Sequence, residues 1–228
     1  LRTEQPLVPE ASVDVVVSNC VLNLVAPEHK RRLFAEIFRV LRRGGRAVIS
    51  DIVSAVEVPK HLRADPELWS GCISGAFQEE AFLTAFEQAG FYGIHLVNRD
   101  AAPWRVVEGI EFRAVTVVAY KGKQGECRDH GQAVIYPGPF KAVLDDDEHL
   151  FQRGVPTAVC AKSFAIYARE PYAGHFELLA PIEPVDPATA PPFDCAPSAT
   201  LTAPGPVPTA RREISGLITP ECQASGCC

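Results

Sequence analysis

A nearly continuous β-branched run, VDVVVS at 13–18, constrains the fold of this chain more than any other feature. Such a run predicts a strand that is buried on both faces, as in a parallel sheet. An amphipathic helix is predicted from His29 to Arg43, ended by Gly44–Gly45, and RAVISDIV at 46–53 predicts a second buried strand. Strand, helix and strand joined by short links form a βαβ unit, so the two strands are expected to be parallel.

The next segment predicts two more helices. Asp65 is expected to cap the first, with Pro66 in its first turn, and this helix is expected to carry Cys72. The second covers 78–91 and is amphipathic. Both helices follow the βαβ unit, as expected of an α/β fold.

Strands predicted at 93–98 and 112–120 complete the first domain, residues 1–120, as the second half of an open, doubly wound α/β sheet. Short β-like runs between turn signals predict a small antiparallel β-rich domain at 127–182, with the acidic run 145–148 as a solvated turn. Dense proline predicts an extended or disordered tail at 183–228.

Charge and hydropathy exclude several classes of function. The net charge of −6 comes without a basic stripe, which argues against a nucleic-acid partner. No apolar run approaches the roughly 20 residues that cross a bilayer, so no membrane partner is expected. Residues 1–10 show no secretory leader, which predicts a cytoplasmic protein. The chain opens with Leu1 and contains no methionine, so an N-terminal truncation is expected.

The eight cysteines leave two interpretations open. No pair of CxxC motifs is present, so the spacing does not predict a zinc site. Composition favours buried core thiols plus a free tail, with three cysteines in the last seven residues. The alternative is a reduced protein that binds something soft, because thiolates select soft metals and metalloids.

Polar side chains follow both strands of the βαβ unit. Ser18, Asn19 and Cys20 come at the end of the first strand, and Ser50 and Asp51 at the end of the second. Ligands of open α/β sheets bind beyond the carboxyl ends of the strands. Ordinary loop capping by the same residue types is an equally good explanation at this point.

Longer stretches of sequence resemble a known family. SNCVLNL at 18–24 and GCISGA at 71–76 are the specific motifs, RVLRRGG at 39–45 is a weaker one, and the terminal CQASGCC is similar to tails of the same family. Together they resemble the arsenite methyltransferases, which are S-adenosylmethionine-dependent enzymes. The resemblance covers roughly residues 12–180 and implies the C-terminal half of a Rossmann-like methyltransferase sheet.

The resemblance also implies roles for individual residues. Ser18, Asn19, Cys20 and Val21 match the family segment that lines the methionine side of S-adenosylmethionine and the metalloid site. Cys72 matches the cysteine that coordinates trivalent arsenic, so Cys72 and Cys20 are the expected catalytic residues. The implied substrate is arsenite or its thiol conjugates, with a thiol reductant as a further partner.

Two features depart from the family pattern. A second arsenic-binding cysteine is expected within 109–120, where Ile110, Glu111 and Val115 stand instead. Cys127 or a tail cysteine is the candidate substitute ligand. The glycine-rich cofactor loop and the acidic ribose-binding residue are also absent, so this chain alone is not expected to bind S-adenosylmethionine tightly.

Two other functions stay open on the sequence. One is a methyltransferase that acts on another small acceptor. The other is a non-catalytic thiol module, in which the tail cysteines capture a metalloid or metal ion and the α/β part is a scaffold.

Overall fold

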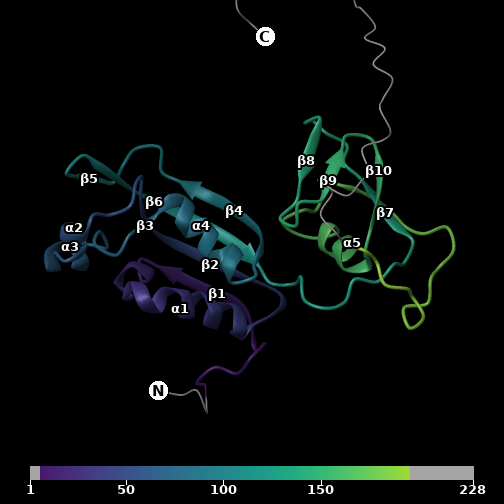
Figure 1. Cartoon of the computed structure of the whole chain (residues 1–228), viewed down its shortest axis with the longest axis horizontal. Coiled ribbons are helices and arrows are strands. Elements are labelled where there is room, and N and C mark those ends of the chain that lie inside the picture. Colours follow the sequence, from purple (N-terminus) through teal and green to yellow (C-terminus); the bar gives the residue numbers. More distant parts are fainter. Residues whose placement is uncertain (1–5, 196–228) are drawn as a thin grey trace, which may run out of the picture. The chain divides into compact units, whose positions relative to one another are not determined.

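The computed structural model describes residues 6–195 (Figure 1). Its N-terminal part contains a mixed α/β sheet with the strand order β1-β2-β6-β4. The first two strands are parallel, as predicted, and β6 runs antiparallel to both of its neighbours. Two short strands extend the sheet, β3 beside β2 and β5 beside β6. The strands are β1 (Val13–Asn19), β2 (Leu41–Ser54), β3 (Phe77–Gln78), β4 (Tyr92–Arg99), β5 (Arg105–Val107) and β6 (Ile110–Tyr120).

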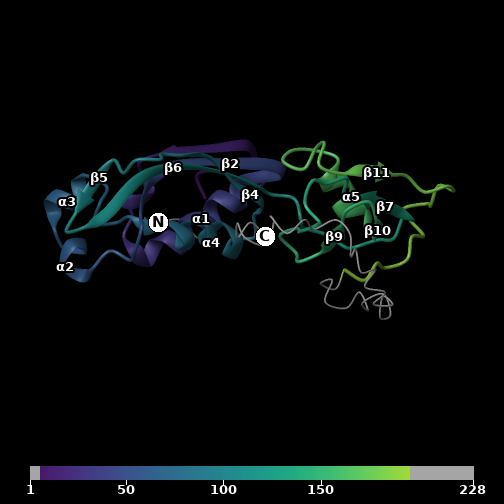
Figure 2. The same ribbon diagram turned by 90° about the horizontal axis from the view of Figure 1, so that it is seen from above.

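Two helices, α1 (Pro27–Val40) and α4 (Glu79–Gln88), lie on the same side of this sheet (Figure 2). Their aromatic side chains contribute to the core, and the rings of Phe34 and Phe86 pack edge to face with their centroids 4.9 Å apart. A doubly wound sheet would carry helices on both faces. Within residues 6–195 the prediction holds only in part, because both longer helices cover one face.

The prediction that the first strand is buried on both faces is wrong. β1 lies at the edge of the sheet in the described part of the chain and pairs only with β2. Val17 is 71% exposed and Val15 is 39% exposed. β-branched composition therefore indicated a strand correctly, but the position of that strand in the sheet decided its burial.

The first helix ends earlier than its sequence predicts. α1 stops at Val40, and Gly44–Gly45 lie inside β2 instead of ending the helix. The ammonium group of Lys121 donates to the carbonyls of Phe38 at 2.8 Å and Leu41 at 2.7 Å. This distant side chain satisfies carbonyls that a glycine cap would otherwise satisfy.

The helix α3 (Pro66–Ser70) begins as predicted, with Asp65 as its N-cap. The Asp65 carboxylate accepts hydrogen bonds from the Glu67 amide at 2.8 Å and the Leu68 amide at 3.2 Å. The helix ends at Ser70, so Cys72 follows it rather than lying on it. A short 3-10 turn, η1 (Leu22–Leu24), and α2 (Lys60–Arg63) are the other helical segments of this part.

Removal of this cap should destabilise the protein measurably. Asp65→Ala is expected to lower the free energy of unfolding by about 1 kcal/mol, because two amide donors lose their acceptor. Urea unfolding followed by circular dichroism measures the change. Asp65→Asn is the matched control and should keep most of the stability, since asparagine caps about as well. Equal losses in both variants would contradict a capping role.

Small antiparallel sheets follow the first sheet. β7 (Gln132–Ile135) pairs with β10 (Pro156–Val159) and β11 (Glu177–Leu179), while β8 (Ala142–Leu144) and β9 (Leu150–Gln152) form a hairpin. The core here is largely aromatic. The ring centroids of Phe151 and Phe176, for example, lie 5.0 Å apart. The antiparallel pairing agrees with the prediction for this segment, whereas the proposed domain boundaries at 120 and 127 stay a prediction.

One helix in this region was not expected. Residues 161–167, predicted as part of a β-rich stretch, form α5 (Ala161–Tyr167). Ser163, Ile166 and Tyr167 are buried and fall at helical spacing. The Cys160 thiol accepts from the Ser163 amide at 3.4 Å and starts the helix. The β-like composition of this stretch was overridden by this cap and by packing on one face.

The acidic run 145–148 forms the predicted solvated turn at its exposed residues 146–148, and only Asp145 departs from that prediction. Asp145 has a side chain that is only 7% exposed, and it pairs with His149 at 2.9 Å. The Tyr167 hydroxyl donates to the same carboxylate at 2.5 Å. Lys123 forms an ion pair with Asp147 at 2.6 Å. The Asp145 carboxylate is thus used inside the fold, which the charge pattern did not indicate, whereas the ion pair of Asp147 lies at the surface.

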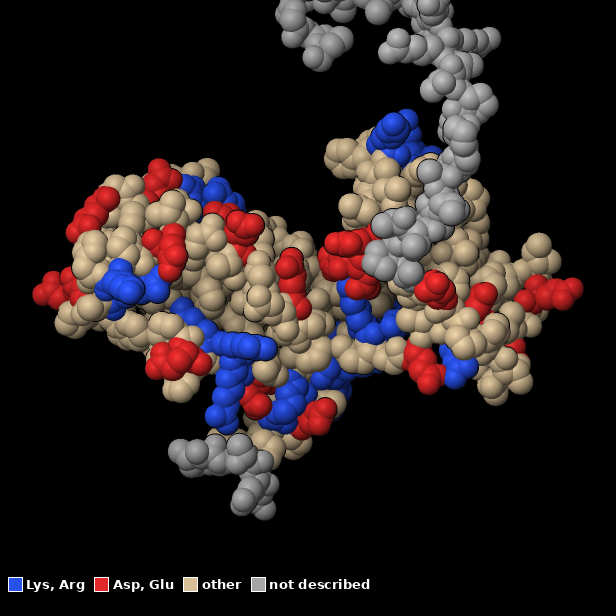
Figure 3. Space-filling view, viewed as in Figure 1, with Lys and Arg blue, Asp and Glu red and all other residues tan. Residues whose placement is uncertain are grey.

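The predicted tail begins with an ordered stretch. Residues 183–195 are described, and Ala190 within them is 2% exposed. The rest of the predicted tail, 196–228, lies outside the described residues. Within 6–195, no helix combines the length and apolar character that a membrane span requires. Acidic and basic side chains are interspersed over the face in Figure 3.

Candidate functional site

The carboxyl end of β1 lies beside the interior of β2, because β2 continues past Ser50 and Asp51 to Ser54. Asn19 is in register with Ser50, and the Cys20 amide donates to the Ser50 carbonyl at 2.9 Å. The prediction that Ser50 and Asp51 end the second strand is therefore wrong, since both lie inside β2, although they do lie next to the residues that end β1. Asn19 and Cys20 are exposed there, and Val21 is 51% exposed. Ser18 is half-buried beside Ile49.

Asp51 lies buried beneath this edge, only 2% exposed. Its carboxylate accepts from the Leu22 amide at 2.9 Å and the Ile52 amide at 2.8 Å. Burial raises the pKa of Asp51, while these hydrogen bonds and the nearby Lys30 oppose that rise. The loop after β1 is thus fixed to β2 through a buried acidic group.

Asn23 connects the same loop to the segment after α3. Its amide nitrogen donates to the Ile52 carbonyl at 2.7 Å and the Cys72 carbonyl at 3.1 Å. The Asn23 side-chain oxygen is buried without a hydrogen-bond partner in the described structure. Sequence reasoning missed this residue, although a lone asparagine in the apolar CVLNL stretch was an available signal.

Lys30 was also missed by sequence reasoning, and its side chain contacts the segment that follows Cys72. Its ammonium group lies 4.0 Å above the Phe77 ring and donates to the Gly75 carbonyl. Burial lowers the pKa of Lys30 to about 8, although Asp51 opposes this. A cavity of about 830 Å³ between α1 and α4 is lined by Lys30 and Gly75 but by neither Cys20 nor Cys72.

Cys20 and Cys72 are in contact at the surface, next to the loop and segment that Asp51 and Asn23 hold in place. The Cys72 thiol donates to the Cys20 carbonyl over 3.6 Å. Both residues have left-handed backbone conformations, with φ of 52° and 59°, which are uncommon for residues other than glycine. Such strain is often found at functional sites. Cys20 is exposed and Cys72 is partly exposed, so a small ligand can reach both.

The two thiols share an electrostatic environment. Burial raises the pKa of Cys20, and the charge of Asp51 raises it further. The same two causes raise the pKa of Cys72, with a further contribution from Cys20. Both thiols are therefore protonated at neutral pH in the free protein.

Replacing the buried acid should change how these thiols react. Asp51→Asn is expected to lower the pKa of Cys20 and Cys72, because a negative charge that opposes thiolate formation is removed. At pH 8 their alkylation by iodoacetamide should be about 2–5-fold faster, because the thiolate is the reacting form. Mass spectrometry of the labelled peptides against pH measures this. An unchanged pH midpoint would show that Asp51 does not act on the thiols.

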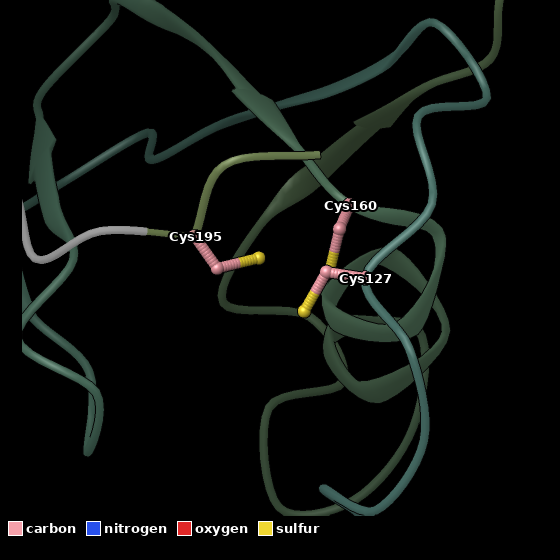
Figure 4. A group of neighbouring side chains, drawn as sticks. All are labelled: Cys127, Cys160 and Cys195. Carbon is pink, nitrogen blue, oxygen red and sulfur yellow. The ribbon is translucent and has the colours of Figure 1, made fainter. Parts of the chain in front are cut away.

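Cys127, the third predicted arsenic ligand, does not group with Cys20 and Cys72. Its sulfur lies within 4.8 Å of the sulfurs of Cys160 and Cys195, and it forms no such group with Cys20 or Cys72 (Figure 4). Within 109–120, Val115 is fully buried in the core. The described part of the chain thus brings two of the three predicted arsenic ligands together, and it groups the third with cysteines that were not singled out.

Two family descriptions match the chain. "Methyltransferase domain" covers residues 3–90, which include β1, β2 and the Cys20–Cys72 pair. A domain of unknown function (DUF8838) covers residues 123–207, which include the three other described cysteines. The second match begins just after β6, where the small antiparallel sheets follow the mixed sheet, whereas β4, β5 and β6 lie between the two matches.

Curated relatives carry one common description, arsenite methyltransferase. The protein from Aquipseudomonas alcaligenes is 31% identical over 75% of this chain and 52% of its own length. The human protein is 30% identical over 75% of this chain and 47% of its own length. The protein from Halobacterium salinarum is 42% identical over 41% of this chain and 23% of its own length. The chain spans about half the length or less of these relatives.

A solved structure shows a similar fold. An arsenic (III) S-adenosylmethionine methyltransferase from Chlamydomonas reinhardtii superposes with a TM-score of 0.50 and 26% identity. The similarity covers 82% of this chain and 65% of that chain. It extends beyond the residues of either matched domain alone. This chain belongs to the arsenite methyltransferase family of class I S-adenosylmethionine-dependent methyltransferases.

Proposed function

We propose that the protein transfers a methyl group from S-adenosylmethionine to trivalent arsenic that is held by Cys20 and Cys72. The observation that carries this proposal is the contact between the two accessible cysteine residues, in which the Cys72 sulfur lies 3.6 Å from the Cys20 backbone carbonyl oxygen. The relatives described as arsenite methyltransferases support the choice of substrate. Soft thiolate ligands suit a thiophilic element such as arsenic.

Binding of arsenite at this pair is a ligand exchange. Each thiol replaces one hydroxyl of arsenous acid, so that one arsenic–sulfur bond forms and the thiol proton leaves with the hydroxyl as water. Because burial and Asp51 raise the pKa of both thiols, the protons needed for this exchange are present at neutral pH. The third arsenic ligand is then a hydroxyl or a thiol of the substrate conjugate.

The chain's own residues position the arsenic. Asn23 and Gly75 fix the Cys72 segment against the loop after β1, and Asp51 fixes that loop against β2. Nucleophilic displacement at a methyl group depends on in-line positioning and exclusion of water more than on a general base. The arrangement of two thiols without a histidine–acid dyad at this edge is consistent with that requirement.

The residues at this edge also fit one side of the cofactor. When bound, S-adenosylmethionine supplies a methyl group activated on a positively charged sulfonium. Ser18, Asn19 and Val21 offer polar and apolar contacts at the strand end, and the carboxylate of Asp51 favours a positive charge beside Cys20. Asn19→Ala is therefore expected to weaken cofactor binding to the full-length protein.

The experiment is methyl transfer by the full-length protein. It is incubated with arsenite, labelled S-adenosylmethionine and a thiol reductant, and the arsenic species are separated by chromatography with arsenic-specific detection. Methylated arsenic that requires the protein supports the proposal. Turnover of S-adenosylmethionine only with a different small acceptor would overturn the choice of arsenic. Arsenite binding without any turnover would instead favour a non-catalytic thiol module.

A further inference from the structure

Three cysteines outside the Cys20–Cys72 pair converge from distant parts of the sequence (Figure 4). Cys127 precedes β7, Cys160 follows β10, and Cys195 is the last described residue. Their sulfur atoms all lie within 4.8 Å of one another. One thiol is buried and two are partly buried. All three fall within residues 123–207, the match to a domain of unknown function.

Backbone hydrogen bonds hold the three segments together without using the thiols. The Phe193 amide donates to the Cys127 carbonyl at 2.9 Å. The Asp129 amide donates to the Pro191 carbonyl at 2.9 Å, and the Ala161 amide donates to the Arg128 carbonyl at 2.9 Å. Thus the segment at 127–129 is bonded on one side to 191–193 and on the other to α5. The cluster is preorganised by the fold, as a ligand site requires.

The thiols differ in how easily they lose a proton. Cys160 is 1% exposed; burial alone would raise its pKa, but hydrogen bonds from Ser163, Cys195 and Cys127 lower the pKa overall. For Cys195, burial and hydrogen bonding to Cys127 and Cys160 raise the pKa.

We propose that Cys127, Cys160 and Cys195 form a second, separate site that binds one trivalent arsenic atom through three sulfurs. Zinc in structural sites takes four protein ligands, and no histidine or carboxylate of the described residues joins this group. Trivalent arsenic forms three bonds and keeps a lone pair, so three thiols complete its ligand set. The choice of arsenic among thiophilic elements rests on the proposed function.

The binding step balances without any redox change. Arsenous acid and three thiols give one arsenic atom with three arsenic–sulfur bonds and three molecules of water. Each thiol proton leaves on a displaced hydroxyl, and arsenic stays trivalent. This site would therefore hold arsenic within residues 127–195. It is separate from the Cys20–Cys72 pair, which follows the end of β1.

The test uses the full chain with the other reactive cysteines replaced. Serine is introduced at Cys20, Cys72, Cys222, Cys227 and Cys228, which leaves the cluster as the described thiol group. The reduced protein is titrated with arsenite and analysed by native mass spectrometry and arsenic X-ray absorption. We expect one arsenic per chain, a mass gain of one arsenic less three protons, and a shell of three sulfur neighbours.

Single changes in this background identify the ligands. Cys127→Ser, Cys160→Ser and Cys195→Ser should each weaken arsenic binding by at least about tenfold. Loss of a group that only hydrogen-bonds to a metal ligand typically costs roughly 10–100-fold in metal affinity, and loss of a ligand itself should cost at least as much. Serine at Cys160 keeps a good N-cap for α5, so this variant is expected to fold. Circular dichroism shows whether each variant is folded. If Cys160→Ser does not fold, the variants at the two less buried positions, Cys127 and Cys195, are enough to test the site.

Several outcomes would overturn the proposal. These are no arsenic uptake by the folded background protein, uptake that none of the three single changes affects, and a parallel titration in which Zn²⁺ binds to the three thiols and arsenite does not. The result is independent of methyl transfer, since the background lacks both Cys20 and Cys72. Failure of the proposed function and failure of this site are therefore distinguishable.

Discussion

Cys72→Ser is expected to reduce methyl transfer to arsenite by the full-length protein by at least about 100-fold. A displacement of only about 1 Å in a reacting group can already cost 10²-fold in rate, and this change removes one of the two proposed protein–arsenic bonds. Cys72 is also the thiol that contacts the loop after β1. Methylated arsenic is measured by chromatography with arsenic-specific detection at saturating S-adenosylmethionine.

Two controls separate loss of an arsenic ligand from general damage. The Cys72→Ser protein should bind S-adenosylmethionine with a nearly unchanged dissociation constant, measured by calorimetry. Deletion of residues 222–228 should leave turnover intact, although it removes three of the eight cysteines. Full activity in Cys72→Ser would remove this residue from the mechanism. Loss of activity on tail deletion would instead favour arsenic capture by the tail.

Gly75→Ala is expected to destabilise the protein by roughly 3 kcal/mol or more, at the upper end of the usual cost of overpacking. A Cβ atom at Gly75 would lie 1.9 Å from the backbone carbonyl oxygen of Asn23. Because this neighbour is backbone, the segment that carries Cys72 must move away from the loop that carries Cys20. Arsenite binding at the pair should therefore weaken together with stability.

The matched control is Gly71→Ala in the same segment. A Cβ atom there meets its nearest neighbour, the Leu68 carbonyl oxygen, at 3.6 Å, an ordinary van der Waals contact. Urea unfolding of both variants gives the difference in free energy, and arsenite titration gives the difference in binding. Equal stability of the two variants would show that the close approach of Gly75 to Asn23 does not constrain the fold.

Local patterns were sufficient for several elements. The βαβ unit, the Asp65 cap, the helix near 79–88 and the strands near 92–99 and 110–120 all follow from hydrophobic periodicity and capping signals. Ser18, Asn19 and Cys20 do lie near Ser50 and Asp51, but through the register of β1 on the interior of β2, because β2 is longer than its sequence predicted. The pairing of Cys72 with Cys20 rested on the family resemblance, since the sequence separation of 52 residues gives no local signal.

Other features depend on contacts between distant residues. The end of α1 is set by Lys121, about 80 residues away, and so Gly44–Gly45 became part of a strand. Burial of β1 is decided by its position at the edge of the sheet, which composition does not specify. The small helix α5 forms because one face of a β-like stretch packs against the core and Cys160 caps its start.

By itself, the sequence determined the mixed α/β class of the first part of the chain, the family resemblance and the end of β1 at which we propose a ligand site, because these depend on short-range periodicity and on motifs. Only the tertiary structure showed that three further thiols lie together. Cys127, Cys160 and Cys195 are joined through backbone hydrogen bonds between segments far apart in the chain. No spacing rule along the sequence encodes such a meeting, because the folded backbone supplies the proximity.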